Sequence, residues 1–477
     1  MSRFNTPAAT VSRTVNLAGG EAFVQAPKME FASILLTSML GDGAYRSGDG
    51  TMARIAELVD AVGPEFAAKA AVFARNEYGM RSVSHVVAGE VAARAKGVTW
   101  TRPFFRSVVR RPDDMTEIVA YFIGKHGRRP LPNSLRDGLA QAFSKFDSYS
   151  LAKYREEGKA VSLVDVVNLV HPKPTERNAE ALKALVDGSL RSTDTWESML
   201  SAAGGDEEAV TGAWADLIRE KKIGYFALLR NLRNIMEQAP DVLDEALALL
   251  VDEESIRRSL VMPFRYMTAA NEIAKLPDSR KVLESIDKAV GIAVQNAPRF
   301  DGRTLVVVDA SSSMTFTLSG KTKTSVADVA ALFAAVIYSR NDADLMLFHT
   351  QAGYAQVMPG SVLGLTQGIR QAMQGGGTDF KPIFQVASKP YDRIVILSDM
   401  QGWVGYNAPT TAFAEYVARV GKRPKVYSFD LAGMGSLQFP EQDVFCLAGF
   451  SDKVFDLMVT LEGDREGLVK RIESIEF

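Results

Sequence analysis

The sequence predicts a chain of two parts: an α-helical, HEAT-like repeat half and a doubly wound α/β half with a parallel sheet. From about residue 30 to 295, amphipathic helical segments follow one another with short breakers between them. After about residue 300, short apolar runs rich in β-branched and aromatic residues alternate with helical stretches. That alternation is typical of a parallel sheet covered on both faces. We expect domains at residues 1–298 and 299–477, because 477 residues exceed what one hydrophobic core usually serves.

The first half contains repeated helical pairs. In residues 51–78, apolar side chains recur at helical spacing on both sides of a Gly-Pro break, and comparable segments occupy residues 82–97, 115–127, 134–146 and 241–260. Helical pairs without intervening strands indicate a stacked solenoid. No clean sequence period is present, so this prediction rests on the helical pattern alone.

The second half contains four predicted strands. They are TLVVVD (304–309), DLMLFH (344–349), RIVILSD (393–399) and KVYSFDL (425–431), with helices predicted at 325–340 and 409–420. A doubly wound domain binds its ligand beyond the carboxyl ends of its strands. Asp309, His349 and Asp399 lie at such ends.

Composition excludes several protein classes. The net charge is formally −2, so binding of nucleic acid would need a local basic patch. The single cysteine, Cys446, excludes an internal disulfide and a cysteine-based zinc site. The first 20 residues lack the apolar core of a secretory signal, and no apolar stretch approaches the roughly 20 residues that span a bilayer. We expect a cytoplasmic protein.

The loop after the first predicted strand, LVVVDASSSMTF (305–316), ends in an acid and three serines. A serine hydrolase would need G-x-S-x-G, whereas Ala310 and Met314 flank these serines, and His349 is the one candidate base. A phosphate-binding P-loop is suggested by Gly320-Lys321-Thr322, but Thr315 stands where its first glycine should be.

A metal site accounts for more of the sequence. Its predicted ligands are Asp309, Ser311, Ser313, Thr378 and Asp399. The D-x-S-x-S spacing aims three oxygens at one point, and the glycines before Thr378 let its loop approach. Oxygen ligands without sulfur or imidazole favour Mg²⁺ or another hard divalent cation. With so few carboxylates, such an ion should keep waters and accept an acidic group from a partner.

These motifs resemble two known modules. DASSSM, GGGTDF and ILSDMQ resemble the metal-ion-dependent adhesion site of a von Willebrand factor A domain. RNEYGMRSVSHVVAGEVA (75–92), KFDSYSLAKYREEG (145–158), VVNLVHPKP (166–174), FALLRNLRNI (226–235) and VMPFRYMTA (261–269) resemble the TROVE module. Together they resemble the Ro autoantigen family, most of all its bacterial members, over nearly the whole chain.

The resemblance implies a ring of HEAT-like helices closed by the von Willebrand A domain. It implies binding of small noncoding Y RNA on the outside of the ring and of single-stranded ends of misfolded RNA in its hole. It also implies RNA decay together with an exoribonuclease such as polynucleotide phosphorylase, the protein being a scaffold and not an enzyme. Lys153 and His171 align with residues of the RNA-binding face.

Local basic clusters agree with RNA binding. Between Arg102 and Arg129 there are seven basic and three acidic residues, and cations of this kind bind phosphates. The expected RNA contacts are Arg110, Arg128, Arg129, Lys153, Arg155, His171, Lys173, Arg230 and Arg233. Glu156 and Glu157 depart from the family pattern, which often has further basic residues near Lys153.

Two other hypotheses compete with an RNA-binding scaffold. One is a metal-dependent protein–protein adhesion scaffold without RNA, in which the helical half is a spacer. The other is a metal-dependent hydrolase or nuclease, which would need a general base beside the metal. Only His349 is a candidate for that base.

Overall fold

The computed structural model describes residues 12–477 except 41–44, 128–129, 156–157, 191–195, 260, 296, 298, 319–322, 359, 405–408, 440–443, 448–457 and 459–466. The chain divides into two compact units. One comprises residues 52–293 with 471–477, and the other comprises residues 1–51 with 294–470. Within the described residues, no helix is both long and apolar enough to cross a bilayer.

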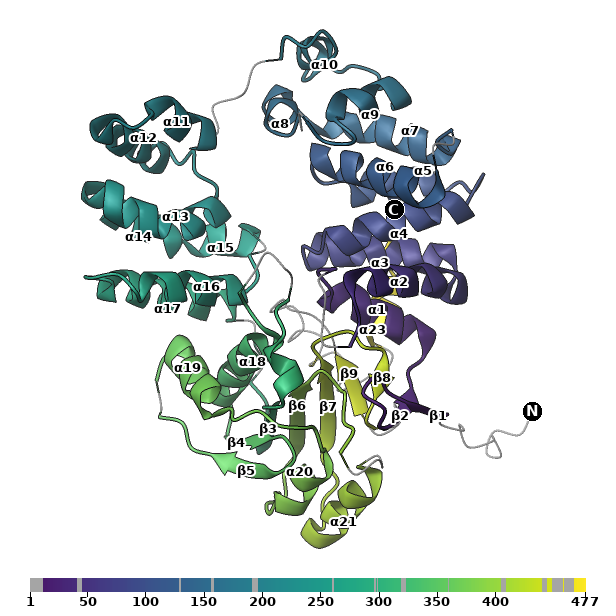
Figure 1. The fold of residues 1–477 in the computed structure, drawn as a ribbon, viewed down its shortest axis with the longest axis vertical. Coiled ribbons are helices and arrows are strands. Elements are labelled where there is room, and N and C mark those ends of the chain that lie inside the picture. Colours follow the sequence, from purple (N-terminus) through teal and green to yellow (C-terminus); the bar gives the residue numbers. More distant parts are fainter. Residues whose placement is uncertain are drawn as a thin grey trace. The chain divides into compact units, whose positions relative to one another are not determined.

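The first unit consists of helices, as predicted (Figure 1). Its earlier helices are α2 (Gly48–Val62), α3 (Pro64–Glu77), α4 (Ser82–Arg94), α5 (Thr101–Val108), α6 (Pro112–His126), α7 (Asn133–Ala142), η1 (Phe143–Lys145), α8 (Ser148–Lys153), α9 (Leu163–Val170) and α10 (Ala179–Val186). Its later helices are α11 (Trp196–Ala203), α12 (Glu207–Arg219), α13 (Tyr225–Gln238), η2 (Pro240–Val242), α14 (Leu243–Leu250), α15 (Glu253–Ser259), α16 (Phe264–Ile273) and α17 (Arg280–Ala293).

The predicted breakers mark real helix boundaries. Gly63 has φ 85°, and Pro64 is the first residue of α3. Proline suits that position because the first helical amide has no acceptor within the helix. Ser162 and Asp165 form a capping box at the start of α9. The helices then pack in pairs, either as chain neighbours, such as α3 with α4, or across intervening helices, such as α5 with α7 and α13 with α16.

A buried ionic cluster joins the early helices. Asp114 of α6 is fully buried and accepts hydrogen bonds from Arg75, Arg81 and His85 at 2.9–3.3 Å. Burial alone would raise the pKa of Asp114, but the His85 hydrogen bond and the arginine charges hold it well below its usual range. These arginines therefore have a structural role in the unit.

The second unit contains a six-stranded sheet. Its elements are β3 (Thr304–Asp309), η3 (Ser312–Thr315), α18 (Val326–Arg340), β4 (Ala343–Phe348), β5 (Ala352–Ala355), α19 (Val362–Ala372), α20 (Lys381–Val386), β6 (Arg393–Ser398), α21 (Thr410–Val420), β7 (Lys425–Asp430) and β9 (Val444–Leu447), with α23 (Gly467–Glu473) at the end of the chain. The strand order is β5-β4-β3-β6-β7-β9, and every neighbouring pair is parallel except β4 with β5.

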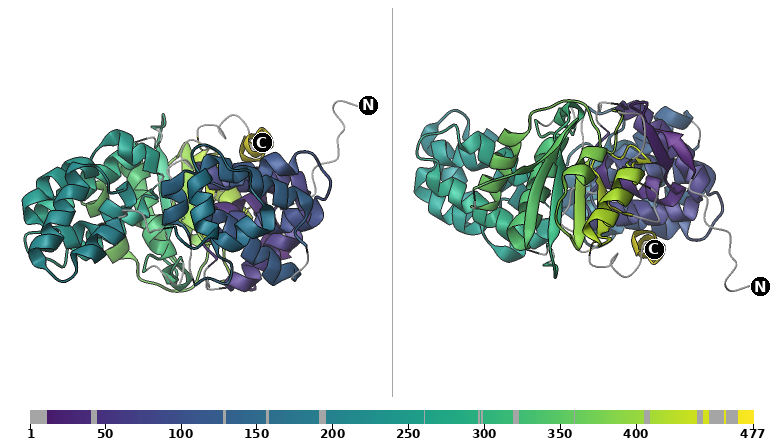
Figure 2. Two further views of the ribbon diagram at one scale, coloured as in Figure 1. Left: turned by 90° about the horizontal axis from the view of Figure 1, so that it is seen from above. Right: turned by 90° about the horizontal axis from the view of Figure 1, so that it is seen from below.

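Helices cover both faces of this sheet (Figure 2). Leu305 and Val307 belong to the core that includes residues of α20 and α21. α18 packs against β3, β4 and β6. Because both faces are buried, the central four residues of β3 and of β6 are all apolar, which is why the sequence identified these strands.

A second, three-stranded sheet was not predicted. β1 (Arg13–Val15) and β2 (Glu21–Val24) form a hairpin, and β2 pairs antiparallel with β8 (Ser436–Leu437). α1 (Pro27–Thr37) lies close to the turn after β7. A Cβ added at Gly433 in that turn would lie 3.1 Å from the Cα of Ile34 in α1. The first 51 residues are thus part of the α/β unit. The domain boundary at 298/299 stays a prediction.

Candidate metal centre and cationic surface

The predicted D-x-S-x-S loop begins where β3 ends. Asp309 is the last residue of β3 and is fully buried. Its Oδ1 accepts a hydrogen bond from the Ser311 amide at 2.9 Å, and its Oδ2 accepts one from the Ser398 hydroxyl at 2.5 Å. The Ser311 and Ser313 hydroxyl oxygens are 3.2 Å apart. The structure thus brings Asp309, Ser311 and Ser313 together, and their role as metal ligands stays a prediction.

The glycine-rich loop is tied to the serine loop. The Ser312 amide donates to the Gly376 carbonyl, and the Gly376 amide donates to the Ser312 hydroxyl, each at 3.0 Å. Gly376 has φ 127°, and a Cβ there would lie 3.1 Å from His349 Nδ1, so glycine is required for this close approach. Thr378, two residues on, is buried, and its hydroxyl has no hydrogen-bond partner.

Asp399 completes a pair of buried carboxylates. It follows β6 directly and is 2% exposed, and its Oδ1 accepts from the Gln401 amide at 3.1 Å. Burial raises the pKa of Asp309 to about 7, with the charge of Asp399 adding to the effect. Burial likewise raises the pKa of Asp399, although hydrogen bonds from Ser313 and the Gln401 amide act to lower it. Two buried acids and the unpaired Thr378 hydroxyl are a donor set that fits a hard divalent cation.

Two residues near this centre were not predicted. Tyr45, from the N-terminal segment, hydrogen-bonds to Ser313; burial raises the pKa of Tyr45, and Asp399 and Asp309 add to the rise. No sequence signal links Tyr45 to a loop so far along the chain. Asp430 ends β7, and burial raises its pKa to about 6. Its strand-end position is the same signal that identified Asp309 and Asp399.

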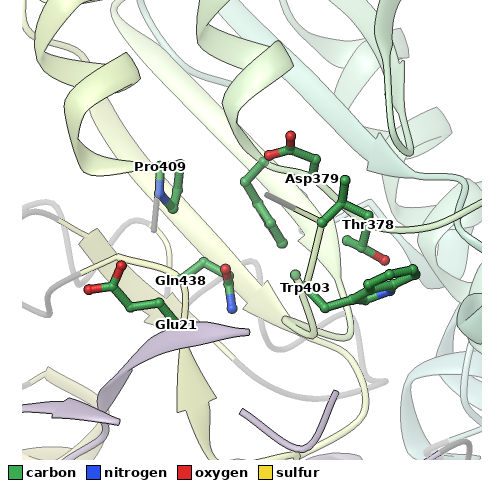
Figure 3. A pocket seen from close by; sticks show the side chains of 9 residues that line it. Glu21, Thr378, Asp379, Trp403, Pro409 and Gln438 are labelled. Carbon is green, nitrogen blue, oxygen red and sulfur yellow. The ribbon is translucent and has the colours of Figure 1, made fainter. Parts of the chain in front are cut away.

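A small pocket lies beside Thr378. Figure 3 shows Thr378 and Trp403 on one side of it, with Glu21 of β2 and Gln438 across from them. The Trp403 amide donates to the Thr378 carbonyl at 3.0 Å, and a Cβ at Gly402 would meet Gln438 Oε1 at 2.7 Å. The Asn16 side chain donates to the Gly402 carbonyl at 2.6 Å. The N-terminal hairpin therefore supports the loop that follows Asp399.

The alternative chemistries gain little support. His349 Nδ1 lies 3.0 Å from the Thr350 hydroxyl, and within the described ranges no hydrogen bond joins His349 to a serine of the loop. Gly320-Lys321-Thr322 lies outside the described residues. The part of the chain that the structure describes contains no group of three or more His, Cys, Asp or Glu side chains placed to hold a metal, so the candidate centre depends on hydroxyl oxygens beside Asp309 and Asp399.

The helical unit places two of the predicted RNA-binding cations, Lys153 and Arg230, against aromatic rings. Lys153, the last residue of α8, has its Nζ 5.8 Å from the Tyr149 ring centroid and 5.7 Å from that of Tyr154. Arg111 lies over Tyr154 at 4.3 Å. Tyr149 is 46% exposed. Sequence reasoning missed both tyrosines, although they belong to the quoted motif at 145–158. It counted Arg111 in the basic cluster at 102–129 but did not select it as an RNA contact.

The other cations predicted near this surface have varied surroundings. Arg155 donates to the Leu190 carbonyl at 2.7 Å. His171 is exposed and ends α9 in a left-handed conformation with φ 51°. Lys173 is exposed too. Arg128, Arg129, Glu156 and Glu157 lie outside the described residues.

Positive charge also gathers around α5 and α6. Arg110 is exposed and donates to the Asn76 carbonyl at 3.2 Å. Lys145 donates to the carbonyls of Arg106 and Val109. Burial lowers the pKa of Lys145 to about 8, and the charges of Arg106 and Arg110 contribute. Burial is the larger cause, and the contribution of Arg106 and Arg110 reflects the positive charge gathered beside Lys145.

The two predicted arginines of α13, Arg230 and Arg233, have different surroundings. Arg230 lies over the ring of Phe226, with 5.8 Å from Cζ to the ring centroid. Arg233 forms an exposed ion pair with Glu237 at 3.1 Å. The prediction of RNA contact stays a prediction for both residues.

Two family models match this chain. The TROVE domain matches residues 40–188 and 187–338, and the Ro60 vWA domain matches residues 303–461. The RNA-binding protein RO60 of Deinococcus radiodurans is 26% identical over 363 residues, which cover 65% of this chain and 66% of that protein. Telomerase protein component 1 of Rattus norvegicus is 23% identical over 345 residues, and this chain spans only 13% of its length.

Among solved structures, the crystal structure of the Deinococcus radiodurans RO (RSR) protein matches with a TM-score of 0.56. The match covers 90% of this chain and 99% of that one at 18% sequence identity. At that identity the likeness concerns the fold.

Proposed function

Because this chain belongs to the TROVE family and carries a Ro60 vWA domain, we propose that it is an RNA-binding scaffold of the Ro type. In this proposal it acts in the cytoplasm, binding small noncoding, Y-like RNA and the single-stranded ends of misfolded RNA. It delivers such RNA to a partner exoribonuclease, of which polynucleotide phosphorylase is the candidate, and cleaves no RNA itself.

The observation that carries the proposal is the cation–aromatic surface at the end of α8. Lys153 lies over Tyr154, Arg111 lies over the same ring while pairing with Asp113 at 2.7 Å, and Tyr149 beside them is exposed. Cations bind the phosphates of any RNA, and exposed aromatic rings stack with unpaired bases. A surface of this kind suits single-stranded RNA without sequence readout, and exposed His171 adds a group able to stack on or hydrogen-bond a base.

In the α/β unit we assign a divalent-cation site, Mg²⁺ by preference, to Asp309, Ser311, Ser313, Thr378 and Asp399. When bound, the cation would supply a positive charge that accepts a carboxylate from a protein partner. The chain's own residues hold the two carboxylates in place: Ser398 and the Ser311 amide donate to Asp309, and the Gln401 amide donates to Asp399. This site would recruit a partner while the helical unit holds RNA.

The RNA-binding assignment is tested with Lys153→Ala combined with His171→Ser. Binding of a fluorescent RNA with a single-stranded 3′ tail is measured by anisotropy over a range of salt concentrations. We expect affinity to fall about tenfold at low salt and the difference to shrink as salt rises, since phosphate contacts are screened.

The control is Arg219→Ala with Lys281→Ala. These exposed cations pair with Glu245 and Asp244. Unchanged affinity of the Lys153/His171 variant at low salt refutes the site. Protein that purifies with protein partners but without nucleic acid supports the adhesion scaffold instead, and processive shortening of labelled RNA in Mg²⁺ supports a nuclease.

A further inference from the structure

Phe226, near the start of α13, is an exposed aromatic side chain contacted by two arginines. Its side chain is 39% exposed. Arg230 lies one helical turn further along α13, with Cζ 5.8 Å from the Phe226 ring centroid. Arg265, the second residue of α16, lies with its Cζ 5.6 Å from the same centroid and 4.9 Å from that of Phe264. Helices α13 and α16 thus place two guanidinium groups against one ring.

Neither guanidinium has an acidic partner among the described residues. Other cations of these and neighbouring helices do: Arg233 pairs with Glu237, Lys275 with Glu272, and Arg280 with Glu284. Burial lowers the pKa of Arg265, and the charge of Arg230 lowers it further. Two like charges held together without a counter-charge leave a positive potential that an anion would relieve.

We propose that Phe226, Arg230 and Arg265 form a binding site for single-stranded RNA, in addition to the surface at α8. A backbone phosphate is held by the two guanidinium groups, and a base stacks against the exposed ring of Phe226. Arg265 is half-buried over Phe264, so its position is fixed before RNA binds. The exposed ring favours RNA over a phosphorylated peptide, because a phosphate group alone needs only the two arginines. This site rests on the proposed RNA-binding function.

The test measures anisotropy of a labelled oligouridylate and of an abasic ribose-phosphate strand of equal length. Arg265→Gln is expected to bind both strands about tenfold more weakly and to reduce the salt slope by about 0.7, the value for one phosphate contact on a single strand. Phe226→Leu is expected to weaken oligouridylate binding about fivefold and to leave the abasic strand unaffected, since it removes the stacking face alone.

Arg280→Gln is the matched control, because it removes one exposed, paired cation from the neighbouring α17 and should bind as wild type does. Melting temperatures equal to wild type show that the variants fold. This inference is overturned if Arg265→Gln and Phe226→Leu bind oligouridylate with wild-type affinity. If the Lys153/His171 variant loses affinity in the same experiment, the proposed function still stands. The stacking role is overturned if Phe226→Leu weakens binding of the abasic strand as much as binding of oligouridylate. Wild-type protein that binds neither strand overturns the proposed function itself.

Discussion

At the scale of single residues, Asp309 links the proposed metal centre to pH. It is fully buried, and burial together with the charge of Asp399 raises its pKa to about 7. In the unfolded chain its pKa returns to an ordinary value near 4. The metal-free fold therefore binds a proton that the unfolded chain has released, so its stability falls as pH rises from about 4 to about 7.

A divalent cation should reverse this pH dependence. We expect Mg²⁺ to raise the melting temperature more at about pH 8 than at about pH 5.5, because protons compete with the metal for the two carboxylates. Melting curves with Mg²⁺ and with a chelator at both pH values measure the effect.

Asp309→Asn serves as its control. It should abolish the response to Mg²⁺ and leave RNA affinity at the wild-type value, since the residues proposed to bind RNA belong to the helical unit. An equal response to Mg²⁺ at both pH values would contradict the assignment of Asp309 as a ligand.

At the scale of elements, the glycine-rich loop positions Thr378 through its contact with the serine loop. Gly376→Ala would force a Cβ to within 3.1 Å of His349 Nδ1 in a backbone region that alanine disfavours. We expect a loss of about 1–3 kcal/mol in the free energy of unfolding and weaker Mg²⁺ binding. Urea unfolding and calorimetric Mg²⁺ titration measure the two quantities.

Gly368→Ala on α19 is the matched control. There the nearest atom to the added Cβ, Val357 Cγ1, would lie 3.7 Å away, which is an ordinary contact, so stability should change little or rise. If Gly376→Ala were as stable as wild type and bound Mg²⁺ equally, the loop would not depend on this glycine.

The sequence predicted those strands whose own residues form a recognisable apolar pattern. β3, β4, β6 and β7 lie within one residue of the predicted runs, because central parallel strands are apolar on both faces. β1, β2 and β8 have two to four residues each, and the pairing of β2 with β8 joins segments far apart in the chain. Too few residues carried a pattern in those strands for the sequence to reveal them.

The candidate sites show the same difference. Apart from Thr378, the proposed metal ligands follow strands, so a known strand order brings Asp309 and Asp399 together, and Asp430 could have been found by the same rule. Arg265 and Phe226 belong to different helices. Their contact depends on how α13 packs on α16, which helical periodicity does not determine. The contact of Tyr45 with Ser313 depends on how the N-terminal segment folds onto the α/β unit, which no sequence pattern indicates.

At the scale of the whole molecule, the two units carry different chemistry. The helical unit carries Lys153 and Arg230 beside the exposed rings of Tyr149 and Phe226, whereas the α/β unit encloses two carboxylates among hydroxyls. The net charge of −2 conceals this division, since the cations of the first unit act locally. Each unit should therefore keep its ligand when the other site is disabled.

Photocrosslinking tests the central claim, that cation–aromatic surfaces of the helical unit hold unpaired RNA, most directly. The full-length protein is irradiated with an RNA whose single-stranded 3′ tail contains 4-thiouridine, and the adducts are mapped by mass spectrometry. We predict crosslinks in peptides containing Tyr149, Tyr154 or Phe226, which are lost when unlabelled single-stranded RNA competes. Crosslinks confined to residues 299–439, or none at all with a bound RNA, would contradict the account.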